Sequence, residues 1–227
     1  MGPPAGHPHF FSLEGIDGSG KSTQLSLLAA HFRKRGMDPV CVREPGGTPL
    51  SDKIRQLLLA PENCIAPAAE LLLYSAARAQ LVSSVIAPAL QAGKLVLADR
   101  FGWSTLAYQG YGRGLDSADI LPLFQVACGN TWPSQSFLLD IPVSAMPGRM
   151  ASDKRAPDRM ESENGEFFER VRQGYLRIAR DHPDRFTVLD GSRPKEAIHR
   201  AILEKMEPLL LDQGSAPRGS TPEHPPA

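Results

Sequence analysis

The sequence has no excess of charge of either sign. Its 25 Lys and Arg residues balance 25 Asp and Glu residues, and the formal net charge at pH 7 is zero. A chain without a broad basic surface is not expected to bind nucleic acid or an anionic membrane. Any anion that it binds must therefore be held by a local cluster of cations.

Cysteine is scarce, and long apolar runs are missing. Cys41, Cys64 and Cys128 show no C-x-x-C spacing, which predicts reduced thiols in a reducing compartment. No unbroken apolar run approaches the ~18 residues that a membrane span needs. The first ten residues, MGPPAGHPHF, lack the basic start and the apolar stretch of a signal peptide. We therefore expect a cytoplasmic protein with no membrane partner.

Short apolar runs alternate with amphipathic segments along the chain. The apolar runs predict five strands, at 9–13, 39–44, 94–99, 136–141 and 185–190. Helical periodicity occurs at about 21–35, 51–60, 68–91 (with a bend near Pro88) and 163–180. This alternation predicts an α/β fold of three layers, a five-stranded parallel sheet flanked by helices.

A single folded domain is expected over residues 9–211. The two ends, 1–8 and 212–227, are rich in proline and lack apolar periodicity, which predicts disordered tails.

The segment LEGIDGSGKST, residues 13–23, contains the pattern G-x-x-x-x-G-K-[ST] between a predicted strand and a predicted helix. Backbone N–H groups of such a loop and of the helix N-terminus bind phosphate, the lysine reaches the β- and γ-phosphates, and the serine hydroxyl binds Mg²⁺. The pattern predicts a P-loop for a nucleoside triphosphate. Its predicted ATP-binding residues are Gly15, Ile16, Asp17, Gly18, Ser19, Gly20, Lys21, Ser22 and Thr23.

The third predicted strand ends in Asp99-Arg100. An acid at this edge of a P-loop fold orients Mg²⁺, so Ser22 and Asp99 are the predicted metal-binding pair. A GTPase would need Asp-x-x-Gly after this strand and an Asn-Lys-x-Asp segment for the base. The sequence has neither, which argues against a GTP switch.

Five segments, in this order and spacing, resemble the thymidylate kinase family over about residues 9–210: GIDGSGKST, REPGGTPLSDKIR, ELLLYSAARAQ, DRFGWSTLAYQGYGRG and DRMESENGEFF. The resemblance implies the P-loop nucleoside monophosphate kinase fold with a short lid. It also implies Mg²⁺-dependent transfer of the γ-phosphate of ATP to dTMP, which gives dTDP and ADP for dTTP biosynthesis. Family members are typically homodimers, and the apolar helical surface around 66–91 is the candidate interface.

The resemblance also implies a dTMP site. Arg55 and Arg100 match positions that hold the 5′-phosphate, and guanidinium groups suit a phosphate dianion. Tyr74 occupies the position of a Phe that stacks on thymine. At the base, Arg78 matches the donor to a thymine carbonyl, and Gln109 matches the side chain that reads N3–H and its neighbouring carbonyl. The remaining matches are Thr105 beside Gln109, Tyr108 near C2′ of the sugar, Asp17 near the 3′-hydroxyl, Glu44 beside the transferring group and Pro45 in the pocket wall.

A basic segment, RMASDKRAPDR at 149–159, follows the fourth strand, where these kinases carry a lid (here about 149–162). The P-loop itself has no arginine, so the chain resembles the bacterial-type branch that carries basic residues in the lid. Positive charge for the transition state is therefore expected from Lys154, Arg155 and Arg159. With Lys21, Arg100, Asp17 and Glu44 they form the predicted catalytic set for direct in-line transfer.

Two other functions fit parts of this pattern. One is a kinase for another nucleoside monophosphate, because the methyl group that separates dTMP from dUMP is worth only ~1–3 kcal/mol. The other is a non-catalytic P-loop module, which would have no use for Arg55, Arg78, Arg100 and Gln109 in one pocket.

Overall fold

The computed structural model describes residues 6–150 and 156–211. Its sheet has five strands, β1 (His7–Glu14), β2 (Val40–Arg43), β3 (Val96–Asp99), β4 (Pro133–Asp140) and β5 (Phe186–Asp190). They are ordered β2-β3-β1-β4-β5, and every neighbouring pair is parallel. The predicted five-stranded parallel sheet is thus confirmed.

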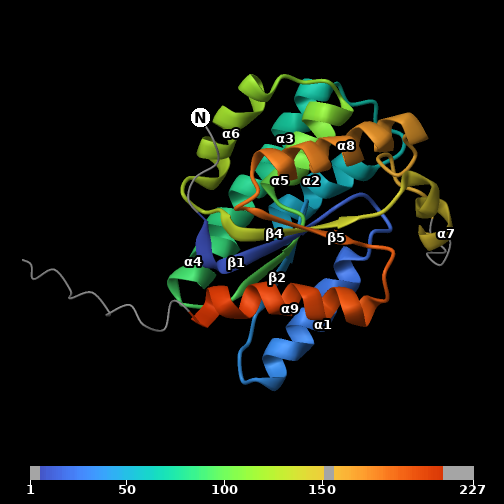
Figure 1. Ribbon diagram of the computed structural model, residues 1–227. Helices are drawn as coiled ribbons and strands as arrows, with labels where there is room; N and C mark the ends of the chain where they lie inside the picture. The colour runs from blue at the N-terminus through green and yellow to red at the C-terminus, as the bar shows by residue number, and fades with distance from the viewer. Residues whose placement is uncertain (1–5, 151–155, 212–227) are drawn as a thin grey trace, which may run out of the picture.

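Helices cover both faces of the sheet, as Figure 1 shows. One face is covered by α1 (Lys21–Lys34) and α9 (Lys195–Leu211). Phe11 and Leu13 of β1 are buried there against Phe32 of α1 and Ile202 of α9. Because both faces of β1 pack against helices, its residues 10–14 are all buried.

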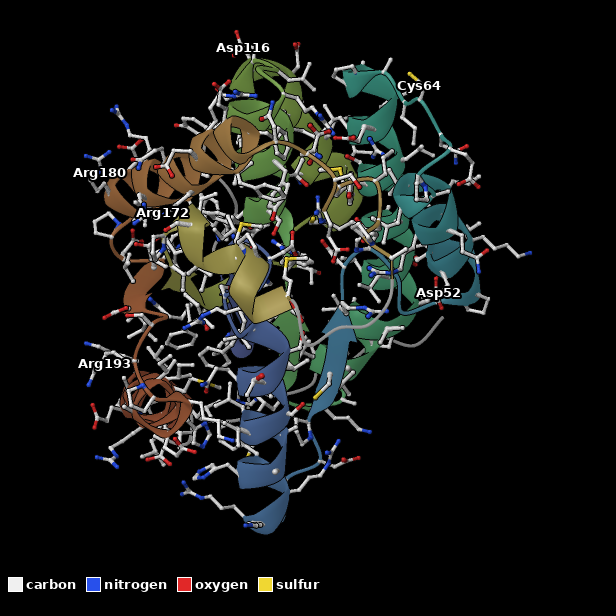
Figure 2. All side chains as sticks on the ribbon, turned by 90° about the vertical axis from the view of Figure 1, so that its right-hand side faces the viewer. Asp52, Cys64, Asp116, Arg172, Arg180 and Arg193 are labelled. Carbon is white, nitrogen blue, oxygen red and sulfur yellow. The ribbon has the colours of Figure 1, made fainter. Side chains whose placement is uncertain are left out.

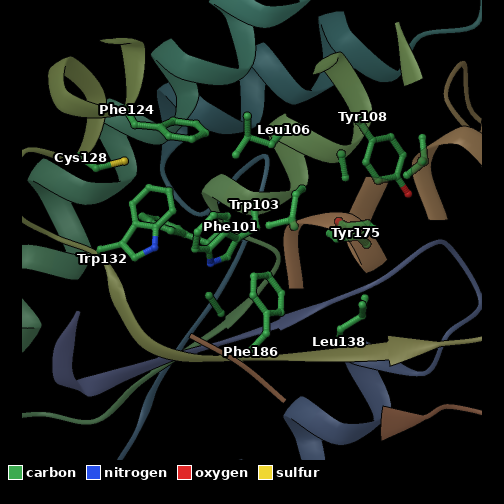
Figure 3. Packing of buried hydrophobic residues seen from close by; sticks show 14 of the residues in the cluster. Phe101, Trp103, Leu106, Tyr108, Phe124, Cys128, Trp132, Leu138, Tyr175 and Phe186 are labelled. Carbon is green, nitrogen blue, oxygen red and sulfur yellow. The ribbon is translucent and has the colours of Figure 1, made fainter. Parts of the chain in front are cut away.

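The opposite face carries the larger core. It is covered by α3 (Pro67–Leu81), the π-helical turn η1 (Val82–Ile86), α4 (Ala87–Gln91), α5 (Gly102–Thr105), the π-helical turn η2 (Leu106–Gly112), α6 (Ser117–Cys128) and α8 (Gly165–Asp181). Aromatic rings fill its centre (Figure 3). Trp103 and Trp132 are fully buried, with ring centroids 5.2 Å apart.

Two further segments lie at the edge of the strands where the P-loop begins. Helix α2 (Pro49–Leu59) follows β2 and starts at Thr48, whose hydroxyl accepts from the N–H of Ser51 at 3.0 Å. After β4 come a 3₁₀ turn, η3 (Val143–Ala145), and the short helix α7 (Met146–Met150). Helices α2 and α7 border the cleft described below.

The structure differs from the sequence predictions in detail. The helix predicted for 68–91 is not simply bent at Pro88, because η1 interrupts it and Pro88 lies in the first turn of α4. The predicted tail 1–8 is wrong for its last residues, since β1 begins at His7, whose N–H donates to the carbonyl of Trp132 at 2.7 Å. Residues 1–5 and the predicted tail 212–227 lie outside the described residues.

One helical run among the described residues, Pro67–Gln91, is long and apolar enough to cross a membrane by length and composition. Its apolar residues Leu71, Leu81 and Ile86 are buried in the core that covers the sheet. Packing in the fold therefore accounts for these buried apolar residues, whereas Leu72 of the same run is exposed.

Candidate active site

The loop between β1 and α1 has the backbone of a phosphate-binding loop. Gly15, Gly18 and Gly20 have positive φ angles of 134°, 74° and 99°, which residues with a Cβ rarely adopt. Gly20 is the N-cap of α1, and the first turn of this helix has no acidic residue. Its N–H groups and the positive end of the helix dipole are suited to an anion.

Lys21, the first residue of α1, is buried against this loop. Its Nζ donates to the carbonyl oxygens of Gly15 (3.1 Å) and Ile16 (2.9 Å). Burial and the nearby guanidinium of Arg100 lower the pKa of Lys21 from 10.5 to about 8. A phosphate bound at the loop would stabilise the ammonium form.

Ser22 and Asp99, the predicted metal-binding pair, lie together. The hydroxyl of Ser22 donates to Oδ2 of Asp99 at 2.6 Å, because β1 and β3 are neighbours and Asp99 pairs with Leu13. Within 6–150 and 156–211, no three His, Cys, Asp or Glu side chains converge into a metal site. The two oxygens suit Mg²⁺, which takes one or two protein ligands and fills its other positions with water and substrate phosphates.

Arg100 connects the phosphate loop to the other side of the cleft. Among the described residues it is the one non-glycine residue with a positive φ angle, 72°. Its guanidinium donates to the carbonyl of Gly15 (2.7 Å), to Oδ1 of Asp17 (2.7 Å) and to the hydroxyl of Tyr108 (3.0 Å). Burial acts to raise the pKa of Asp17, but Arg100 and Lys21 outweigh burial and hold it below its ordinary value.

Glu44 and Arg78, both predicted to lie in the acceptor site, form a buried ion pair. Nε of Arg78 lies 2.8 Å from Oε2 of Glu44, and Nη2 lies 2.7 Å from the same oxygen. Burial disfavours the charge of Arg78, yet the Glu44 carboxylate raises its pKa above the ordinary value. Nη1 of Arg78 is buried and has no hydrogen-bond partner in the described part of the chain. This donor is available for a ligand.

Arg55, from α2, lies beside the same wall. Its Nη1 donates to the carbonyl of Pro45 at 2.9 Å. Burial and the neighbouring Arg43 lower the pKa of Arg55. A second cation so close is unfavourable unless an anion binds between them, as a phosphate group would.

Thr105, Tyr108 and Gln109 come from α5 and the π-helical turn η2, a type of turn often found at functional sites. Nε2 of Gln109 donates to Oε1 of Glu70 on α3 at 2.9 Å. Oγ1 of Thr105 is buried and has no partner among the described residues.

These groups line one cleft of about 570 Å³. The predicted site residues in its lining are Asp17, Gly18, Gly20, Lys21, Ser22, Thr23, Glu44, Pro45, Arg55, Tyr74, Arg78, Asp99, Arg100, Thr105, Tyr108 and Gln109. Gly15, Ile16 and Ser19 belong to the P-loop but do not line the cleft, and Ile16 and Ser19 are buried beneath it. The phosphate loop and the predicted acceptor residues therefore face a common space.

Comparison with known proteins agrees with this geometry. The family model for thymidylate kinase matches residues 13–202. The chain belongs to the thymidylate kinase family. It is therefore a nucleoside monophosphate kinase. The thymidylate kinase of Pseudomonas putida is 50% identical over 205 residues, 90% of this chain and 98% of the relative.

Other relatives support the same family. The thymidylate kinase of Halothermothrix orenii is 47% identical over 204 residues, 89% of this chain and 98% of its own length. The crystal structure of thymidylate kinase from Ehrlichia chaffeensis superimposes with a TM-score of 0.71 at 32% identity, covering 90% of this chain and 99% of that one. The predicted nucleoside monophosphate kinase fold is confirmed.

The segment predicted to form the lid, about 149–162, lies only partly within the described residues of this thymidylate kinase family member. Arg149, in α7, donates to the carbonyls of Gly18 (3.4 Å) and Gly191 (3.0 Å), so α7 lies against the P-loop. Figure 2 views the molecule from this side, with α7 next to the N-terminal end of α1. Lys154 and Arg155 lie outside the described residues.

The structure does not support the predicted role of Arg159 as a lid cation. Its Nε donates to the carbonyl of Leu58 at 2.7 Å, and its Nη2 lies 2.7 Å from Oε2 of Glu70. Arg159 is not part of the cleft lining. The buried carboxylate of Glu70 therefore holds the guanidinium of Arg159 away from the phosphate loop. The presence of a basic residue in the sequence does not show which carboxylate it pairs with.

Sequence reasoning also missed several groups at the site. Glu14 and Glu70 are fully buried carboxylates that hold cleft residues in place, and Tyr175 contacts Arg100 at 3.2 Å. Arg149 was noted only as part of a basic segment, although it lines the cleft. A carboxylate directly after an apolar run, as in HFFSLE, is the one signal that could have indicated Glu14.

Proposed function

We propose that this chain transfers the γ-phosphate of ATP to dTMP in the presence of Mg²⁺ and so forms ADP and dTDP. The observation that carries the proposal is the common cleft, whose lining includes Lys21 and Ser22 of the P-loop together with the guanidinium groups of Arg55, Arg78 and Arg100. Membership of the thymidylate kinase family supports the same reaction.

ATP is assigned to the P-loop, residues 15–23, through the N–H groups of the loop and the ammonium of Lys21. Ser22 and Asp99 are the residues that would hold Mg²⁺, since their 2.6 Å contact brings a hydroxyl and a carboxylate oxygen together. Bound there, the ion would neutralise charge on the phosphates of ATP.

The acceptor is assigned to the opposite side of the cleft. Arg55 and Arg100 bind the 5′-phosphate of dTMP, while Tyr74 stacks on the base. Arg78 offers Nη1, which has no other partner within the described ranges, to a thymine carbonyl. The other dTMP contacts are assigned to Asp17, Glu44, Pro45, Thr105, Tyr108 and Gln109, all of which line the cleft.

Transfer is direct and in line, with no covalent enzyme intermediate. Lys21 and Arg100 neutralise charge on the transferring phosphoryl group, and Asp17 and Glu44 keep Arg100 and Arg78 in position through ion pairs of 2.7 Å. The acceptor phosphate is already ionised near neutral pH, so no general base is required. Lys154 and Arg155 remain the predicted lid cations.

The proposal is tested by measuring ADP release with ATP, Mg²⁺ and each of dTMP, dUMP, UMP, CMP, AMP and GMP. We expect the highest kcat/KM with dTMP and a smaller value with dUMP, because a single methyl separates them. A preference for CMP or AMP would instead indicate a different monophosphate kinase. No release with any acceptor would indicate a non-catalytic nucleotide-binding module.

We also propose that the chain forms a homodimer and acts in the cytoplasm, as the sequence predicts. Leu72 of α3 is 56% exposed and Val126 of α6 is 81% exposed, and both come from the same helical layer. Exposed apolar side chains on neighbouring helices are suited to contact with a second copy.

A further inference from the structure

Glu70 is a charged residue buried beside the base-reading end of the cleft, and the reaction itself does not use it. It lies on α3 and has no exposed surface. Oε1 accepts from Nε2 of Gln109 at 2.9 Å and from Nε of Arg113 at 3.1 Å. Oε2 lies 3.1 Å from Nη2 of Arg113 and 2.7 Å from Nη2 of Arg159. Each oxygen therefore has its own set of cationic or amide neighbours.

The carboxylate determines which way the amide of Gln109 is turned. Burial acts to raise the pKa of Glu70, but hydrogen bonds from Arg113 and Gln109 outweigh burial and lower it. An ionised carboxylate only accepts hydrogen bonds, so the amide must turn its NH₂ group toward Glu70. Gln109 lines the cleft and makes no other side-chain hydrogen bond among the described residues. Its carbonyl oxygen is left as the acceptor for a bound base.

We propose that Glu70 is a specificity-positioning residue, which selects a base with an N3–H group by holding the carbonyl of Gln109 toward the cleft. This inference rests on the proposed function, because it assigns the base to the Gln109 side. Thymine and uracil carry a hydrogen on N3 and can donate to that carbonyl. Cytosine has a lone pair on N3 and no hydrogen there. Its N3 and the carbonyl oxygen of Gln109 would both be acceptors, so neither would have a hydrogen-bond partner.

Replacing Glu70 by glutamine should reverse the amide. Two guanidinium groups, those of Arg113 and Arg159, face the Oε2 position, whereas one guanidinium N–H, from Arg113, faces Oε1. The single carbonyl oxygen of the new side chain is therefore drawn to the Oε2 position, at the loss of the weaker 3.1 Å contact at Oε1. Its NH₂ group then occupies the Oε1 position and faces Gln109. The side-chain carbonyl of Gln109 then accepts from this NH₂ group. As a result, the NH₂ group of Gln109 faces the cleft, where it can donate to N3 of cytosine.

The test compares kcat/KM for dTMP and dCMP in the wild type and in Glu70→Gln. We expect the ratio of dTMP to dCMP to fall at least about tenfold in Glu70→Gln, mostly through KM for the monophosphate, with KM for ATP unchanged. Arg113→Lys is the matched control. It removes the fork to Glu70 but keeps the contact between Glu70 and Gln109, so its ratio should remain within about threefold of the wild type.

The exchange variant Glu70→Gln/Gln109→Glu keeps the inference testable if Glu70→Gln alone folds poorly. In this variant the amide at position 70 donates to one oxygen of the carboxylate at position 109, and the other oxygen is an acceptor for the base. We expect the preference for dTMP to return to within about threefold of the wild type. An unchanged ratio in folded Glu70→Gln, or a preference that stays lost in the exchange variant, would overturn the inference. Absence of dTMP activity in the wild type would instead refute the proposed function.

Discussion

At the scale of single residues, Lys21 and Arg100 carry the largest expected part of catalysis. Both are charged groups in the cleft lining, and in the proposed mechanism both neutralise charge that grows in the transition state. Lys21→Ala and Arg100→Ala should each lower kcat at least about 10³-fold in the ADP-release assay with dTMP. Lys195→Ala is a matched control, because its side chain is 64% exposed and lies outside the cleft lining, and it should keep normal turnover. Near-normal kcat in either cleft variant would contradict these assignments.

Glu14 is expected to affect stability rather than catalysis. Its carboxyl has no exposed surface and accepts from the N–H of Phe101 at 3.0 Å and from the hydroxyl of Ser104 at 2.7 Å. Burial raises the pKa of Glu14 from 4.5 to about 7. Between these two values the folded state keeps a proton that the unfolded state has lost, so the free energy of unfolding should fall as pH rises through this window.

Urea unfolding of the wild type and Glu14→Gln at several values between pH 4.5 and 7 measures this effect. The free energy of unfolding is expected to fall by about 3 kcal/mol across the window because of Glu14. Glutamine cannot ionise, so the variant should lose this part of the pH dependence. The same slope in both proteins would show that another group titrates.

Single residues differ in whether their role can be predicted from the sequence. The P-loop lysine, Ser22 and Asp99 were predicted because a short pattern and its place after a strand define their chemistry. The roles of Glu70 and Arg159 were not, because they depend on contacts between residues far apart in the chain: 39 positions separate Gln109 from Glu70, and 101 separate Arg159 from Leu58. Separation along the chain hides such contacts from any local pattern.

At the scale of elements, the turn from β3 into α5 is fixed by close packing. A Cβ on Gly102 would lie 2.1 Å from Cη2 of Trp132, which is itself fully buried among aromatic rings. Gly102→Ala should therefore lower the free energy of unfolding by about 1–3 kcal/mol in denaturant unfolding. Gly165→Ala, at the start of α8 with no atom within 4 Å of the added Cβ, should be neutral or slightly stabilising. Equal effects of the two changes would argue against the packing explanation.

Elements differ in how well the sequence predicts them. All five strands and α1, α2 and α8 follow from apolar period and turn residues, and their predicted bounds differ from those observed by only a few residues. The π-helical turns η1 and η2 could not be predicted, because a period of 3.6 residues does not distinguish them from an α-helix. Gln109 lies in η2. The orientation of its side chain therefore could not be predicted from the sequence.

At the scale of the whole molecule, the exposed apolar side chains predict a dimer. Leu72→Glu/Val126→Lys should shift the mass in light scattering from twice 24.6 kDa to that of one chain. The matched variant Val188→Lys changes another exposed apolar residue, on β5, and should keep the dimer. A monomeric wild type would contradict the proposed assembly.

At position 100, the residue type that the backbone favours differs from the one that the proposed reaction requires. The backbone of Arg100 is left-handed, and its N–H donates to the carbonyl of Leu13 at 3.0 Å. Glycine or asparagine adopts this conformation with less strain than arginine does. Its guanidinium, however, is the group that spans the loop and the acceptor side. A library of all substitutions at position 100 should therefore enrich different residues when it is sorted for thermal resistance and when it is sorted for growth that depends on the enzyme. Protein engineers who optimise this scaffold for robustness alone would be led away from arginine.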